Sequence, residues 1–163
     1  MTAIAPSVAE AVGCAGGWLF DQVLSGWDVT VITPERCDPR PLRILGVRGS
    51  YLEDALSAPL AGPCLEALAL RTDLYAGDAR IRRLVRRAAE ANGAEIRLWG
   101  DTWPEDFDAA GAVSHQLSLA ARAFKAQALA AVSGQAAAQA KSTADTEVFQ
   151  RGEIRRPLLA VAH

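Results

Sequence analysis

Short apolar runs alternate with amphipathic segments along most of this chain. The runs at 27–33 and 42–47 are rich in aliphatic and β-branched residues and are bounded by glycine and proline, which predicts two buried strands. The runs at 64–70 and 95–99 predict two more strands. The run at 64–70 also fits a helix, because periodicity alone does not decide a short apolar run, and we favour a strand.

Helical spacing and capping residues predict helices between these runs. Ser7 and Glu10 form a capping box before a helix at 8–25, and Ser50 and Glu53 form another before a short helix that ends near Pro59. Asp78 is a good N-cap for a helix at 79–91. Apolar residues at helical spacing over 109–132 predict the longest helix of the chain.

The alternation of helices and strands predicts an α/β fold of Rossmann-like type. We expect a small, mainly parallel sheet of three to four strands flanked by helices, with a long C-terminal helix and an extended tail. Residues 1–132 are expected to form a single α/β domain, and 133–163 a linker and a C-terminal segment. That segment either docks onto its own core or binds a partner through Phe149, Ile154, Leu158 and Leu159.

Composition narrows the classes of partner. The 163 residues carry a formal net charge of -2, which gives no overall attraction for nucleic acid or an anionic membrane. Five arginines are clustered at 80–87, but no aromatic residues interleave with them, so a solvated helix face is the preferred interpretation. The three cysteines show no zinc-binding spacing, and no export or membrane-spanning signal is present, so a cytoplasmic location is expected.

A glycine-containing stretch precedes the predicted strand at 27–33. The sequence Val12-Gly13-Cys14-Ala15-Gly16-Gly17, followed by a helix and a strand, resembles the first part of dinucleotide-binding Rossmann domains. The resemblance implies that the glycines approach a pyrophosphate and that Glu35 binds ribose. The spacing is GxxGG where that family has GxGxxG. The alternative is that these glycines let a helix pack closely on the sheet.

The predicted turn after 42–47 offers a possible anion site. Arg48, Gly49 and Ser50 combine a cation, a small residue and a helix N-cap, and unpaired helix amides attract anions. If the strands are parallel, Asp101 lies at the same edge of the sheet. A small anionic ligand, such as a nucleotide or a phosphorylated metabolite, is therefore one candidate, and ordinary capping is the other.

An acidic segment follows the predicted strand at 95–99. Its carboxylates suit Mg²⁺ or Ca²⁺, or acid–base chemistry; they are Asp101, Glu105, Asp106 and Asp108. Acidic residues are also typical of the turn before a helix, which is the competing interpretation. His115 has no serine or cysteine nucleophile placed beside it by any motif.

No strong catalytic motif occurs in the sequence, and no cofactor is identified by it. The leading expectation is therefore a cytoplasmic binding or regulatory module that acts through protein–protein contacts, as a homodimer or with another protein partner. The alternatives are a small-ligand binding domain at the carboxyl ends of the strands and a metal-dependent hydrolase or transferase that uses the carboxylates of 101–108.

Overall fold

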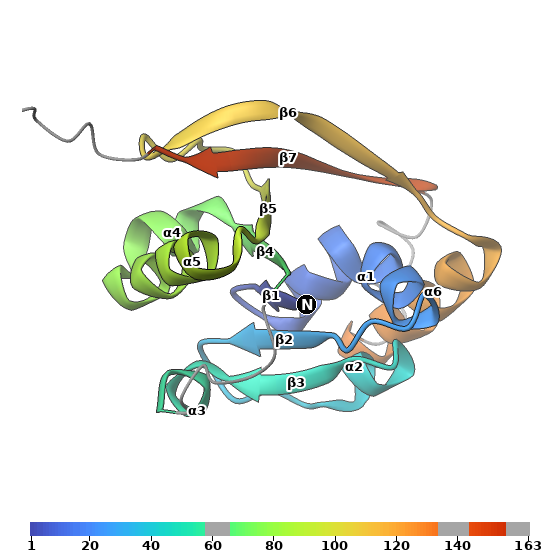
Figure 1. Ribbon diagram of the computed structural model, residues 1–163. Helices are drawn as coiled ribbons and strands as arrows, with labels where there is room; N and C mark the ends of the chain where they lie inside the picture. The colour runs from blue at the N-terminus through green and yellow to red at the C-terminus, as the bar shows by residue number, and fades with distance from the viewer. Residues whose placement is uncertain (58–65, 134–143, 156–163) are drawn as a thin grey trace, which may run out of the picture.

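The computed structural model describes residues 1–57, 66–133 and 144–155, and within them seven strands form one sheet in the order β3-β2-β1-β4-β5-β7-β6 (Figure 1). The strands are β1 (Thr2–Ile4), β2 (Thr30–Thr33), β3 (Arg48–Tyr51), β4 (Ala67–Arg71), β5 (Glu95–Trp99), β6 (Phe107–Gln116) and β7 (Thr146–Ile154). The helices are α1 (Val8–Leu24), α2 (Arg40–Ile44), α3 (Leu52–Ser57), α4 (Thr72–Gly77), α5 (Ala79–Asn92) and α6 (Leu119–Ser133).

The first five strands are parallel and the last two extend the sheet. Strands β3, β2, β1, β4 and β5 pair in parallel, whereas β7 pairs antiparallel with both β5 and β6. The order of the parallel part is that of a Rossmann-type sheet. The expected α/β class with a mainly parallel sheet is confirmed, and the sheet is wider than the three to four strands expected.

Helices cover both faces of the sheet, and the side chains of each central strand alternate between them. Ala3, Val31 and Ala69 pack with α1, α2 and α6, while Ile4, Ile32 and the leucines of β4 pack with α3, α4 and α5. This alternation follows from the two-residue period of a strand. In Figure 1, α4 and α5 lie on the opposite side of the sheet from α1 and α6.

Residues 40–51 form a helix followed by a strand, so the strand predicted at 42–47 is wrong. Pro39 and Pro41 fit the first turn of a helix, where a missing amide costs nothing, and α2 begins there. Leu42 and Leu45 are three positions apart and are both buried, as a short helix requires. Gly46 ends the helix with φ +71°, and the strand follows as β3.

Residues 107–116 form a strand, so the single helix predicted over 109–132 is wrong in its first part. Strand β6 pairs with β7 in register from Phe107 to Gln116, with a shift between Ala109 and Ala112. Gly111, at φ +105°, lies at that irregularity. The alanines of this segment favour a helix locally, but the ladder offered by β7 satisfies their backbone groups as a strand. The second part of the prediction is α6.

The C-terminal segment enters the sheet between β5 and β6 as β7. Figure 1 shows β6 and β7 as two long ribbons that run side by side along the top of the molecule, from above α4 and α5 toward α6. Residues 134–143 of the expected linker, and Leu158 and Leu159 of the expected partner-binding set, lie outside the described residues. Among the described residues, no helix combines the length and the apolar character needed to cross a bilayer.

Candidate functional site

The carboxyl ends of the parallel strands lie at one edge of the sheet, and the sheet order reverses there between β1 and β4. Strands β2 and β3 lie on one side of β1, and β4 and β5 lie on the other. Open α/β sheets bind ligands outside the carboxyl ends of their strands, at this type of reversal. The side chains that follow β1 and β4 are therefore the first candidates for a functional site. We call this position the carboxyl edge.

Glu10 and Arg71 meet at the carboxyl edge. Glu10 lies in the first turn of α1, soon after β1, and Arg71 is the last residue of β4. Arg71 Nη1 lies 2.7 Å from Glu10 Oε1. The thiol of Cys14, one helical turn further on, donates to the same oxygen at 3.3 Å. Both of these contacts use Oε1 of Glu10.

Asp73, at the start of α4, holds the other side of the same guanidinium. Arg71 Nε lies 2.9 Å from Asp73 Oδ1 and 2.8 Å from Oδ2. Burial works to raise the pKa of Asp73, but hydrogen bonds from Arg71 and the Asp73 backbone amide hold that pKa below its ordinary value. The hydrogen bond to Asp73 raises the pKa of Arg71, so the guanidinium remains charged between two carboxylates.

Two buried hydrogen-bond donors adjoin Arg71. Thr72 follows it in the chain and is 2% exposed, and Trp99 faces it across the β4–β5 ladder and is 7% exposed. Neither the Thr72 hydroxyl nor the Trp99 indole N–H has a hydrogen-bond partner among the described residues. The hydroxyl nevertheless lies close enough to the Asp73 carboxylate to help lower the pKa of that carboxyl. It lies against Gly100, where a Cβ would come within 2.3 Å of Thr72 Oγ1.

The glycines that resemble a dinucleotide-binding turn lie inside α1 instead. Gly16 and Gly17 are buried helical residues, and the amides of Gly17 and Trp18 donate to the two carboxylate oxygens of Glu147 at 2.9 and 2.7 Å. A Cβ on Gly17 would lie 2.1 Å from Leu117 Cδ2. These glycines therefore permit close packing on α1, although the neighbour of Gly17 is Leu117, after the end of β6, and not the sheet itself as the alternative expected.

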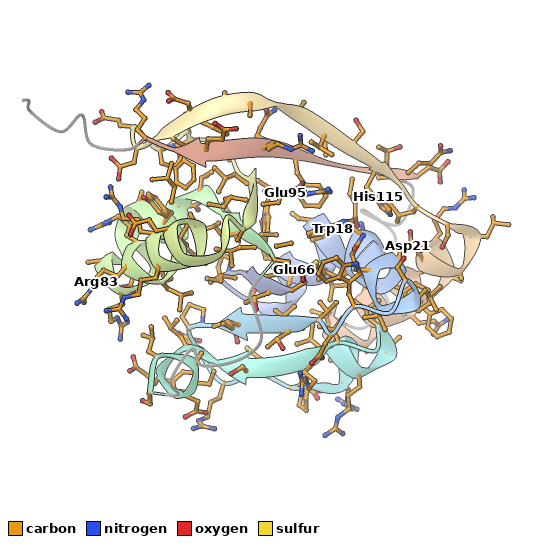
Figure 2. The ribbon with its side chains drawn as sticks, viewed as in Figure 1. Trp18, Asp21, Glu66, Arg83, Glu95 and His115 are labelled. Carbon is orange, nitrogen blue, oxygen red and sulfur yellow. The ribbon has the colours of Figure 1, made fainter. Side chains whose placement is uncertain are left out.

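Asp21, His115 and Ser118 form a second polar cluster. His115 Nε2 lies 2.8 Å from Asp21 Oδ2, and the Ser118 hydroxyl donates to Asp21 Oδ1 at 2.6 Å. Figure 2 shows Asp21 on α1 and His115 on β6. The Ser118 hydroxyl also accepts from the Ala121 amide, at the start of α6. Because the serine binds the aspartate and not the histidine, the cluster lacks the order of a nucleophilic triad and ties α1, β6 and α6 together.

The residues expected to form an anion site are not brought together. Arg48, Gly49 and Ser50 lie within β3, where Arg48 forms an ion pair with Asp28. Asp101 follows β5, and three strands separate β3 from β5 in the sheet. The expectation rested on a helix N-terminus at Ser50, but this residue is inside a strand.

Two of the four carboxylates in the acidic segment after β5 are paired with arginines. Asp106 accepts from Arg86 at 2.8 Å and from the Tyr75 hydroxyl at 3.2 Å, and Asp108 accepts from Arg155 at 2.6 Å. The hydrogen bond from Arg86 holds the pKa of Asp106 below its ordinary value. Asp101 and Glu105 are exposed. A metal role for the four carboxylates was one of the alternatives, and the structure gives two of them, Asp106 and Asp108, arginine partners.

The residues considered for partner binding differ in exposure. Phe149 is 1% exposed and packs against the Trp18 ring at 4.9 Å, so its side chain belongs to the core. Ile154 is partly buried against the cluster formed with α4 and α5.

The arginines at 80–87 lie on α5. Among them, Arg83 is exposed and points away from the sheet in Figure 2.

Sequence reasoning missed Arg71 and Asp73 and assigned Glu10 only a capping role. The Ser7 half of the capping box is confirmed, since the Ser7 hydroxyl accepts from the Glu10 amide at 3.1 Å, while the Glu10 carboxylate contacts Arg71 and Cys14. The available signal was the short apolar segment before Pro6. Interpreted as a strand, it makes Ser7 to Glu10 a strand-to-helix turn, which is the usual place for ligand-binding residues in this fold class.

Comparison with known proteins gives similarity in structure only. No protein-family model matches the sequence, and no curated protein matches it. Among solved structures, the fold is similar to a deacetylase–teicoplanin complex from the teicoplanin biosynthesis pathway (TM-score 0.65, 15% identity, 95% of this chain and 98% of that chain). It is also similar to a zinc-inhibited form of teicoplanin deacetylase (0.61, 14%, 96% and 98%) and to the A40926 pseudoaglycone deacetylase (0.60, 17%, 95% and 97%).

These similarities correct the leading functional expectation. At such low identity they establish the fold, and that fold extends over nearly the whole length of proteins that are enzymes. The interpretation as a non-catalytic regulatory module that acts through protein–protein contacts is wrong on this finding. An enzymatic alternative is the better starting point.

Zinc is named for one of these structures, which raises the question whether the side chains at the carboxyl edge can bind zinc. Zinc sites in proteins take three or four nitrogen, sulfur or oxygen ligands from histidine, cysteine and carboxylates. Among residues 1–57, 66–133 and 144–155, no three such side chains are grouped to hold a metal ion. At the carboxyl edge the carboxylates of Glu10 and Asp73 already bind a guanidinium. These residues do not fit a zinc site.

Proposed function

We propose that this chain is a hydrolase that removes an acetyl group from its substrate at the carboxyl edge, between the turns that follow β1 and β4. The observation that carries the proposal is the correspondence of fold with deacetylases over at least 95% of each chain. The geometry adds support, because Glu10 and Arg71 provide a carboxylate and a fixed cation at the reversal of the sheet order.

Glu10 is proposed as the general base. Its Oε1 is held by Arg71 and Cys14, which fixes the orientation of the carboxylate, and Oε2 is proposed to receive a proton from water. Arg71 is proposed to bind the acetyl carbonyl. A guanidinium has five N–H donors, and those not used by Glu10 and Asp73 can stabilise the negative charge that develops on the carbonyl oxygen.

The reaction requires water and the bound amide only. Glu10 Oε2 takes a proton from water as the water oxygen bonds to the carbonyl carbon, and the carbonyl electron pair moves to the oxygen that faces Arg71. When the carbonyl re-forms, the C–N bond breaks, and the leaving nitrogen takes the proton back from Glu10. The products are acetic acid, which ionises in solvent, and the free amine, and Glu10 is a carboxylate again.

Chromogenic acetyl compounds test the proposal. We expect the protein to release p-nitroaniline from p-nitroacetanilide or p-nitrophenol from p-nitrophenyl acetate. Replacement of the base by Glu10→Gln should lower kcat/KM by about 100-fold or more, the usual contribution of a general base. The matched control is Glu90→Gln, a change of the same type on the exposed side of α5. Turnover that survives Glu10→Gln unchanged, or no turnover of any acetyl amide or ester, would overturn the proposal.

A cytoplasmic location and a homodimer were expected from the sequence and are kept here as predictions. Cell fractionation and sedimentation of the purified protein test them directly. A dimer that dissociates without loss of Glu10-dependent turnover would separate assembly from the proposed reaction.

A further inference from the structure

The guanidinium of Arg71 occupies the position between the two acidic side chains of the carboxyl edge. It contacts Glu10 through Nη1 and Asp73 through Nε, at distances of 2.7 to 2.9 Å, and its side chain is only 27% exposed. A guanidinium has no lone pair for a metal and does not lose its proton in proteins. A divalent cation at this place would have to displace Arg71 or lie beside its positive charge.

The neighbouring polar groups are also hydrogen-bond donors. The Trp99 indole N–H can only donate, and the Thr72 hydroxyl and the Trp99 N–H are both buried without a hydrogen-bond partner among the described residues. Buried polar groups normally have a partner, so the Trp99 N–H, on the strand position that pairs with Arg71, calls for an acceptor, whereas the Thr72 hydroxyl already interacts with Asp73. A carbonyl oxygen meets that need, whereas a metal ion does not.

We infer that Arg71 takes the place of a metal ion at the carboxyl edge, so that the cation which binds the substrate carbonyl belongs to the protein chain itself. The identity of the carbonyl as an acetyl group rests on the proposed function. The exclusion of a divalent cation rests on the contacts of Arg71 with Glu10 and Asp73. The two parts can therefore fail separately.

Thermal unfolding with zinc chloride tests the inference and does not require turnover. The informative quantity is the part of any zinc-induced shift in Tm that depends on Glu10, measured as wild type minus Glu10→Gln. We expect this part to be zero within error, and we expect EDTA to leave the wild-type Tm and any acetyl turnover unchanged. Zinc bound at other surface groups shifts both proteins equally and does not enter the difference.

A gain of metal binding is expected when the guanidinium is removed. In Arg71→Ala, the carboxylates of Glu10 and Asp73 lose the cation that lies between them, so zinc should raise Tm by more than it does in wild type. The shift should vanish in the double variant Arg71→Ala/Glu10→Gln. If Arg71→Ala does not fold, the wild-type and Glu10→Gln comparison decides alone.

Either of two results would overturn the inference: a zinc-dependent increase of wild-type Tm that Glu10→Gln abolishes, or a loss of wild-type acetyl turnover in EDTA. Failure of the proposed function has a different signature. In that case no acetyl compound is hydrolysed. The zinc-induced shifts in Tm of wild type and Glu10→Gln can still be compared, because that comparison does not need turnover.

Discussion

The ammonium of Lys125 lies 2.6 Å from Glu147 Oε1, and the two side chains are only 5% and 3% exposed. Glu147 lies on β7 and Lys125 on α6, and the same carboxylate accepts the amides of Gly17 and Trp18 from α1. One buried carboxylate thus joins a late strand to two helices. The Glu147 carboxylate has its hydrogen-bond partners and its counter-charge only when β7, α1 and α6 are all folded and packed together.

Removal of the carboxylate should destabilise the fold strongly. Glu147→Gln leaves the Lys125 ammonium buried without a counter-charge, and loss of one partner from a buried ion pair costs about 3–5 kcal/mol. The free energy of unfolding in urea measures the loss. The double variant Lys125→Met/Glu147→Gln should recover part of it, because it removes the unpaired charge. The account would be contradicted if the double variant lost more stability than the sum of the losses measured for Lys125→Met and Glu147→Gln separately.

An exposed ion pair between α6 and the residue before β7 provides the control for that measurement. Arg122 Nη1 lies 2.8 Å from Asp145 Oδ1, with side-chain exposures of 38% and 64%. Exposed pairs contribute about 0–1 kcal/mol. Asp145→Asn should therefore change the free energy of unfolding far less than Glu147→Gln does.

Gly17→Ala should destabilise the protein even though alanine favours a helix. The new methyl group would lie 2.1 Å from Leu117 Cδ2, and overpacking of this kind costs about 1–3 kcal/mol. The combined change Gly17→Ala/Leu117→Ala should be less destabilising than the sum of its parts, because it removes the clash. Gly77→Ala is the matched control: nothing lies within 4 Å of its added Cβ, so it should be neutral or slightly stabilising.

Acid should weaken the polar cluster of Asp21, His115 and Ser118. Burial works to raise the pKa of Asp21, but hydrogen bonds from Ser118 and His115 hold it below the ordinary value of 3.8. A carboxyl group whose pKa is lower in the folded state adds stability above its unfolded pKa, and this contribution is lost as pH falls through the folded value. Asp21→Asn should thus be less stable than wild type at pH 7, and the difference should shrink below about pH 4. A difference in Tm that does not change between pH 7 and pH 3 would contradict the assignment.

The Tyr75 hydroxyl should contribute a modest part of the stability on the other face of the sheet. It donates to Asp106 Oδ2 at 3.2 Å, and its ring is 1% exposed against Phe107. Tyr75→Phe keeps the ring and removes one hydrogen bond, which is worth about 0.5–1.5 kcal/mol. Tyr75→Ala should cost about 3–5 kcal/mol, as for other large aromatic truncations. Equal effects of the two changes on urea unfolding would contradict this division.

The sequence by itself determined the elements whose signals are local. Helix α1 begins after its Ser7 cap, α5 begins after its Asp78 cap and ends at Gly93, and β5 follows its alternating pattern. These signals depend on neighbouring residues along the chain, so no tertiary information was needed to interpret them. Together they were sufficient for the α/β class.

Tertiary structure decided the rest, because the deciding contacts join residues far apart in the chain. The alanine-rich start of β6 is a strand only because β7 pairs with it, and the glycines of α1 are explained only by Leu117 and Glu147. The candidate site also depends on contacts between residues that are far apart in the chain. Glu10 is a local capping residue until the sheet order places β4 beside β1 and brings Arg71 within 2.7 Å of its carboxylate.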